Sequence, residues 1–176
     1  MAKILFIVAQ NKFRDEEFFH PRDILKSHEI EVASLTTKTA TGVLGGEIKP
    51  DLDIEEALKR VKDDAYDAVI FVGGQGAIEY FTHPAALDIA RTAAESDAVK
   101  VLGAICIAPL ILAHAGVLDG KKVTCWDDDK GTKKKIIESK GAAFVAKNVV
   151  ADGKIVTANG PQSAKKFGEK IFDMLK

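Results

Sequence analysis

The sequence predicts an α/β fold in which helices cover a mostly parallel sheet. Short β-branched, apolar runs alternate with amphipathic stretches along the chain, a pattern typical of such folds. Four runs are almost continuously apolar, as strands buried on both faces should be, and we expect them in the middle of the sheet: 3–8, 30–35, 68–72 and 101–105. No linker or internal repeat divides the 176 residues, so we expect a single domain over 1–176.

The first half of the chain carries two helix-start signals. Acidic residues open a predicted helix over 15–27, where negative charge suits the positive end of the helix dipole, and Pro21 lies inside it. Asp53 and Glu56 have the spacing of a capping box, which predicts a helix that runs through Val61. A third helix is expected over 84–95.

The second half predicts a hairpin and a closing helix. Asp152-Gly153 between two apolar runs is a strong hairpin signal, with strands over 148–151 and 154–157. Pro161 suits the first turn of a last helix that extends to residue 175. We also expect a short strand over 123–126 and a helix over 130–139, whose lysines we interpret as a solvated face.

Composition excludes several classes of function. The chain has 25 Lys and Arg against 26 Asp and Glu, a net charge of −1, and therefore lacks the basic excess of a nucleic-acid-binding protein. Its apolar stretches are shorter than the roughly 20 residues of a membrane-spanning helix, so no membrane partner is expected. No signal peptide is evident, which predicts a cytoplasmic protein with Cys106 and Cys125 as free thiols.

The segment around Cys106 is the strongest candidate for chemistry. The predicted strand 101–105 ends directly before Cys106, and a helix is expected to begin within two residues. A strand-to-helix elbow lifts one side chain above the edge of the sheet where open α/β folds bind ligands. Backbone amides beside the sulfur would favour the thiolate, which is the reactive form. The alternative is an ordinary buried cysteine.

A glycine turn after strand 68–72 supports the reactive interpretation. Gly73, Gly74 and Gly76 could direct backbone N–H groups at a developing oxyanion, or they could serve only to allow positive φ angles. The turn does not match a dinucleotide-binding fingerprint, because Glu79 occupies the third glycine position. We expect neither a cofactor nor a metal site.

The chain resembles the ThiJ/PfpI superfamily, which includes the parkinsonism-associated deglycase and archaeal intracellular proteases. The resemblance covers nearly the whole chain and rests on five motifs: the strand 3–9, Glu17-Phe-Phe-His-Pro21, the turn 72–77, Ala104-Ile-Cys106-Ile-Ala-Pro109 and Asn159-Gly160-Pro161. It implies a flavodoxin-like three-layer sandwich and a homodimer. It also implies that Cys106 is the elbow nucleophile, Glu17 the acid beside the sulfur, and the N–H groups of Gly74 and Ile107 the oxyanion hole.

Physical chemistry agrees with the role that the resemblance implies for Glu17. A carboxyl group held close to a thiolate should have a raised pKa, because the like charge disfavours its ionisation. It would then remain protonated, and it could donate a hydrogen bond or move a proton during a reaction.

This sequence departs from the superfamily at the histidine. Protease-like members have a histidine directly after the nucleophile, where this chain has Ile107, and other members have one at the position that corresponds to Trp126. His20 is the remaining histidine expected near Cys106, as a site-lining residue. Trp126 could narrow the mouth of the site, or it could fill a gap in the core or at a dimer interface. Peptide hydrolysis is disfavoured, because its amine leaving group must be protonated.

Two functions remain. In the first, the chain is a stress-response enzyme that needs no cofactor: Cys106 adds to a small reactive carbonyl such as methylglyoxal, Glu17 moves the proton, and hydrolysis yields a hydroxy acid. In the second, peroxide oxidises the same thiol, and the protein acts as an oxidation sensor or in a chaperone-like role without turnover. The expected partners are therefore small carbonyls or peroxides, besides a second copy of the chain.

Overall fold

The computed structural model describes residues 1–176 and has a seven-stranded sheet at its centre. The strands lie in the order β11-β12-β8-β7-β1-β3-β6, and every neighbouring pair is parallel except β11 with β12. The strands β3-β1-β7-β8-β12 have the order of a flavodoxin-like sheet, as expected. Their bounds are β1 Lys3–Ile7, β3 Glu29–Ser34, β6 Leu52–Asp53, β7 Ala68–Phe71, β8 Val101–Ile105, β11 Val149–Asp152 and β12 Ile155–Ala158.

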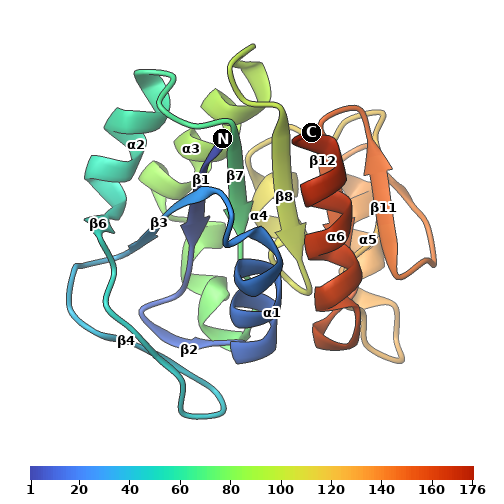
Figure 1. Ribbon diagram of the computed structural model, residues 1–176. Coiled ribbons are helices and arrows are strands. Elements are labelled where there is room, and N and C mark those ends of the chain that lie inside the picture. The colour runs from blue at the N-terminus through green and yellow to red at the C-terminus, as the bar shows by residue number, and fades with distance from the viewer.

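Helices cover both faces of this sheet and complete the three layers (Figure 1). One face carries α1 (Asp15–Leu25) and α6 (Ala164–Met174), which pack on each other. The other face carries α2 (Ile54–Lys62), α3 (Pro84–Glu95), α4 (Pro109–His114) and α5 (Thr132–Ser139). Short 3₁₀ helices precede α3 and α6, at Gln75–Phe81 (η1) and Pro161–Ser163 (η2).

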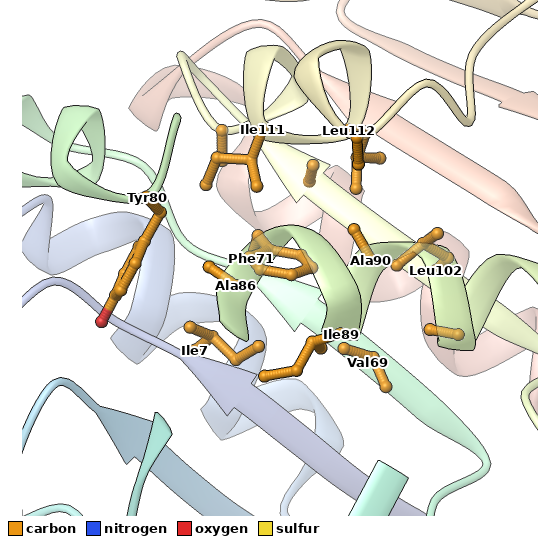
Figure 2. Close-up of a cluster of buried hydrophobic side chains, with 14 of the residues drawn as sticks. Ile7, Val69, Phe71, Tyr80, Ala86, Ile89, Ala90, Leu102, Ile111 and Leu112 are labelled. Atoms are coloured by element: carbon orange, nitrogen blue, oxygen red, sulfur yellow. The ribbon is translucent and has the colours of Figure 1, made fainter. Parts of the chain in front are cut away.

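The larger part of the core lies between the sheet and α3 and α4. Figure 2 shows Val69 and Phe71 of β7 facing Ile89 of α3, with Ile111 of α4 above them. These four side chains are fully buried. Tyr80 of η1 closes one end of this cluster, and its hydroxyl donates to the carbonyl of Val8 at 2.7 Å. This hydrogen bond fixes η1 against the carboxyl end of β1.

The other face is built around aromatic rings. Phe6 of β1 and Phe18 of α1 pack edge to face, with ring centroids 5.2 Å apart, and both are buried. Phe13 is also buried and belongs to the same core. Gly103 of β8 leaves room for Phe167 of α6, since a Cβ at Gly103 would lie 3.1 Å from that ring.

Several predicted boundaries shift in the structure. The helix expected over 15–27 ends at Leu25, and the one expected over 130–139 begins at Thr132. The hairpin forms, but Asp152 pairs with Ile155, so its two turn residues are Gly153 and Lys154 rather than Asp152-Gly153. Gly153 has a φ of +58°, which explains why the turn is centred on this glycine.

The short strands are the elements that the sequence predicted least well. The strand expected over 123–126 is β9, Lys122–Val123, which pairs with β10, Ala143–Phe144. A third sheet contains β2 (Asn11–Phe13), β4 (Ala40–Gly42) and β5 (Glu47–Ile48), none of which has a clear pattern in the sequence. Segments of two or three residues are too short to show a period. No helix in the structure combines the length and the apolar character needed to cross a bilayer.

The predicted cap of α2 forms through one of its two hydrogen bonds. The Asp53 carboxylate accepts the backbone N–H of Glu56 at 2.8 Å, whereas the Glu56 side chain contacts Arg60. We expect Asp53→Ala to lower the free energy of unfolding by about 1 kcal/mol, because one N–H at the start of the helix loses its acceptor. Urea unfolding would measure this. Asp63→Ala at the opposite end of α2 is the control and should cause no loss; equal losses in both variants would contradict the capping role.

Candidate active site

Three chain segments meet at the carboxyl ends of the central strands. The segment after β1 leads into α1 and Glu17, the turn after β7 contains Gly73 and Gly74, and the turn after β8 contains Cys106. The strands β1, β7 and β8 are parallel neighbours, so their carboxyl ends lie at the same edge of the sheet. Strand pairing therefore brings Glu17 and Cys106 to the same place, although they are far apart in the sequence.

Cys106 occupies a strained position at this edge. Its φ is +65°, a left-handed conformation that costs a residue other than glycine about 1–2 kcal/mol. Two hydrogen bonds hold the backbone there: the Cys106 N–H donates to the carbonyl of Ala158 at 2.9 Å, and its carbonyl accepts the N–H of Trp126 at 2.8 Å. Helix α4 begins at Pro109, slightly later than predicted. The predicted elbow is present, and its side chain is half-buried.

Glu17 is a completely buried acid. Its exposed fraction is 0%, and neither carboxyl oxygen has a conventional hydrogen bond. Burial is the main cause that raises its pKa, to about 8, while the Cys106 side chain and the N–H of Gly73 oppose the shift. The acid is therefore protonated at neutral pH, as the sequence analysis expected of a carboxyl group close to this sulfur.

Gly73 allows Glu17 and Cys106 to approach each other. A Cβ at Gly73 would lie 2.6 Å from the carbonyl oxygen of Ile105 and 2.7 Å from Cys106 Cβ, and it would also collide with the Glu17 carboxyl group. Real Cβ atoms almost never come this close to other heavy atoms. The space that a side chain would fill at this position is the space in which the acid and the thiol meet.

The charge state of Cys106 depends on that of Glu17. Burial raises the pKa of the Cys106 thiol, and the negative charge of an ionised Glu17 raises it further, whereas the N–H groups of Gly74 and Ile107 lower it. The expected backbone amides thus face the sulfur, but they do not outweigh burial and an ionised Glu17. A proton on Glu17 removes the like charge, so one of the causes that raise the pKa of Cys106 is absent while the acid is neutral, and burial of the thiol remains.

These groups line a cavity of about 500 Å³. Five of the residues singled out from the sequence are in its wall: Glu17, Gly74, Cys106, Ile107 and Trp126. Trp126 lies at the mouth, with 42% of its surface exposed. Seven further residues complete the wall: Arg14, Val43, Gln75, Ile78, Phe81, Lys133 and Pro161.

His20, which the sequence suggested as a site-lining residue, is not part of this wall. It lies three residues beyond Glu17 in α1, about 4.5 Å farther along the helix axis, and is half-buried. No other histidine lines the cavity. His114 packs against Phe81 from outside, with ring centroids 5.4 Å apart. The residue next to Cys106 is therefore Ile107, with an alkyl side chain, and the residue at the mouth is Trp126, with an indole, as the sequence indicated.

Sequence reasoning missed the two cations of the wall. Lys133 was assigned to a solvated face, but it is half-buried and borders the cavity. Arg14 had no signal apart from its place beside the acidic start of α1. Its guanidinium pairs with Glu16, with 2.7 Å between Nε and Oε2.

The second cysteine, Cys125, is only 2% exposed, and burial raises the pKa of its thiol. No three His, Cys, Asp or Glu side chains are arranged to hold a metal ion.

Comparison with known proteins agrees with this arrangement. The sequence model of the DJ-1/PfpI family matches residues 2–174. The chain belongs to the DJ-1/PfpI family. This result confirms the resemblance inferred from the motifs.

Several relatives have named activities or solved structures. A deglycase of Pyrococcus horikoshii is 32% identical over 176 residues, which cover 99% of both chains. A glutathione-independent glyoxalase of Caenorhabditis elegans is 30% identical over 155 residues, 87% of this chain and 77% of the relative. Among solved structures, a ThiJ/PfpI domain protein of Brachyspira murdochii has a TM-score of 0.89 at 32% identity, and covers 98% of this chain and 95% of its own.

The role of Gly73 is testable by adding one methyl group. We expect Gly73→Ala to separate Glu17 from Cys106, to slow alkylation of Cys106 at least tenfold and to destabilise the fold by about 2 kcal/mol, an ordinary cost of overpacking. Alkylation would be followed by mass spectrometry and stability by urea unfolding. Gly116→Ala is the control: a Cβ there meets no atom within 4 Å, and only the strain of its φ of +79° remains. Unchanged reactivity in Gly73→Ala would contradict this role.

Burial of Glu17 also predicts a pH dependence of stability. Its pKa is about 8 in the folded protein, against an ordinary value of 4.5, so between these values the folded state keeps a proton that the unfolded state has lost. The free energy of unfolding should therefore fall as pH rises from 5 to 8, by on the order of 3 kcal/mol from this group. In a Cys106→Ser background, Glu17→Gln should remove that fall.

Urea unfolding at pH 5 and pH 8 measures this difference. Glu16→Gln in the same background is the matched control. The pKa of Glu16 is lowered although burial opposes the shift, because Arg14 donates hydrogen bonds to its carboxylate. It therefore remains charged over this range, and its loss should not change the slope. A slope in Glu17→Gln equal to that of the parent would show that Glu17 is not held protonated.

Proposed function

We propose that this protein is a cysteine-dependent, cofactor-free enzyme that converts small 2-oxoaldehydes to hydroxy acids. The observation that carries the proposal is the position of Cys106. Its side chain reaches a cavity of about 500 Å³, beside a buried acid and with the N–H groups of Gly74 and Ile107 facing the sulfur. The deglycase and glyoxalase names of relatives support the same chemistry.

The first step is addition of the thiolate to the aldehyde. The sulfur of Cys106 forms a bond to the aldehyde carbon, and the π electrons of the carbonyl group move to its oxygen. N–H groups aimed at the sulfur are also placed to donate to an oxygen bound one atom away, where negative charge develops. A proton from Glu17 then neutralises that oxygen and gives a hemithioacetal.

The second stage moves a hydrogen and releases the acid. Glu17, now a carboxylate, takes the proton from the carbon that bears the sulfur, and the electrons of that C–H bond form a C=C bond as the neighbouring carbonyl becomes an enolate. Glu17 returns this proton to the neighbouring carbon. The hydroxyl proton of the sulfur-bearing carbon passes to the neighbouring oxygen, so that the first carbon becomes a carbonyl and the second carries the alcohol. The product is a thioester of Cys106. Water breaks the carbon–sulfur bond, which restores the thiol and releases the hydroxy acid. Methylglyoxal plus water thus yields lactic acid, with no oxidant or reductant.

The composition of the wall argues against peptide hydrolysis. An amine leaving group must take a proton, and the position next to the nucleophile is Ile107. The proposed reaction has no amine leaving group when the substrate is a free aldehyde. One protonated acid is then sufficient for every proton transfer.

The kinetic test uses methylglyoxal and follows lactate. We expect Cys106→Ser to reduce turnover to background, and Glu17→Gln, which keeps the shape but not the acid, to lower kcat about 10²- to 10⁴-fold. Cys125→Ala is the matched control, because Cys125 is buried outside the cavity wall and should leave kcat unchanged. Equal activity in wild type and Cys106→Ser would exclude the proposed mechanism.

The same geometry favours oxidation of Cys106 as a second candidate function. A thiolate that attacks peroxide becomes a sulfenic acid as the peroxide O–O bond breaks, and a second peroxide gives the sulfinate. The N–H groups of Gly74 and Ile107 and a protonated Glu17 would donate to its oxygens. If methylglyoxal is not consumed while peroxide adds two oxygen atoms to Cys106, as seen by mass spectrometry, the sensor is supported and the enzyme is not.

A further inference from the structure

Two cations border the cavity from separate elements. Arg14 precedes α1, and Lys133 lies in the first turn of α5. Lys133 has no ion pair within 4.0 Å. Arg14 is paired with Glu16, yet it also responds electrostatically to Glu17 and Cys106, so its charge is felt at the reacting sulfur. The charge of Lys133 is therefore unpaired, whereas that of Arg14 is shared between Glu16 and the cavity.

No permanent negative charge in the wall balances these cations. Glu17 is the one carboxyl group that lines the cavity, and it keeps its proton to about pH 8. The acids near Lys133 lie at the start of α5: Asp127 accepts the backbone N–H of Lys133 at 2.9 Å, and Asp128 accepts that of Thr132 at 2.9 Å. Both carboxylates keep their charge, but neither lines the cavity. Among the residues of the wall itself, the two cations therefore face no ionised carboxylate at neutral pH.

The cavity is also larger than a three-carbon aldehyde requires. Its volume of about 500 Å³ lies in the range of sites that hold much bigger ligands, roughly 300–1,000 Å³. Val43, Ile78 and Trp126 add apolar surface to its wall, and each has more than a third of its surface exposed. Such a wall suits a carbon chain that extends away from the reacting aldehyde.

We propose that Arg14 and Lys133 make this cavity select 2-oxoaldehydes that carry a carboxylate or phosphate at the end remote from the aldehyde. The inference rests on the proposed function and names its substrate class. The anionic group takes no part in bond making: the aldehyde end reacts with Cys106 as above, and the remote end is held by the cations. Lys133 is thus a specificity-determining residue.

The first test needs no turnover. Iodoacetate and iodoacetamide alkylate the same thiol and differ in one negative charge, so their rate ratio at Cys106 reports the local potential. Relative to 2-mercaptoethanol, we expect the iodoacetate to iodoacetamide ratio to be about fivefold higher at Cys106, an effect that one or two nearby cations can supply. Mass spectrometry of the Cys106 peptide separates this reaction from any at Cys125.

Matched charge variants assign the effect to its source. Lys133→Gln should lower the ratio at Cys106 at least threefold. Lys135→Gln removes the same charge from the same helix, at an exposed residue outside the cavity wall, and should leave the ratio unchanged. A wild-type ratio no higher than that of 2-mercaptoethanol, or equal losses in the two variants, would overturn the proposal.

The second test compares substrates. The pair 4,5-dioxopentanoate and 2-oxopentanal share the 2-oxoaldehyde end, and a methyl group in the second replaces the carboxylate of the first. We expect wild type to have the higher kcat/KM for the anionic compound, and Lys133→Gln to lower the ratio of the two values. If 2-oxopentanal is turned over with no preference for the anion, the proposal fails and the proposed function stands. If neither compound is consumed, the proposed function fails, and the alkylation ratio still decides whether the cavity selects anions.

Discussion

The contact between the Glu17 carboxyl group and the Cys106 sulfur is the constraint on which the rest of the site depends. A carboxyl group with no exposed surface and no conventional hydrogen bond is held in its neutral form by burial. In that form it does not repel a thiolate. In its charged form it does. The two groups therefore titrate as a coupled pair, and the protonation of Glu17 affects how readily the Cys106 thiol ionises.

The fold bears the energetic cost of this arrangement. A buried acid with no conventional hydrogen bond and a cysteine with a φ of +65° are each unfavourable. Cys106 packs against the apolar cluster on the face of the sheet that α1 and α6 cover, and α1 also carries Glu17. The backbone of Cys106 is fixed by hydrogen bonds to Ala158 and Trp126. Stability gained by ordinary packing thus holds an unfavourable local geometry at the edge of the sheet.

The cavity has two chemically different parts. The inner part contains the sulfur, the acid and backbone N–H groups, which suit a reaction at one carbonyl carbon. The outer part contains Arg14, Lys133 and exposed apolar side chains, which suit the recognition of a longer and charged molecule. The inner groups belong to the segments after β1, β7 and β8, and Arg14 shares the first of these, whereas Lys133 is contributed by α5.

The sequence by itself determined the fold class, the central strands and the inner part of the site. Continuous apolar runs mark buried parallel strands, and the Cys106 elbow and the Gly73-Gly74 turn directly follow two of them. Glu17 was identified through its place in a motif of the family to which the chain belongs, and the structure places it, buried, beside Cys106. These signals come from neighbouring residues or from residues that directly follow a strand. They can therefore be recognised in the sequence without the tertiary structure.

Only the tertiary structure decided which charged and aromatic side chains reach the cavity. A lysine in an amphipathic helix has the same pattern whether it faces water or a pocket, so Lys133 could not be separated from Lys134 and Lys135. His20 was expected near the sulfur, but it lies three residues beyond Glu17 in α1 and does not line the cavity. The short strands that place the mouth residues lack a period. Each of these features depends on the packing of segments distant in sequence, which local pattern does not encode.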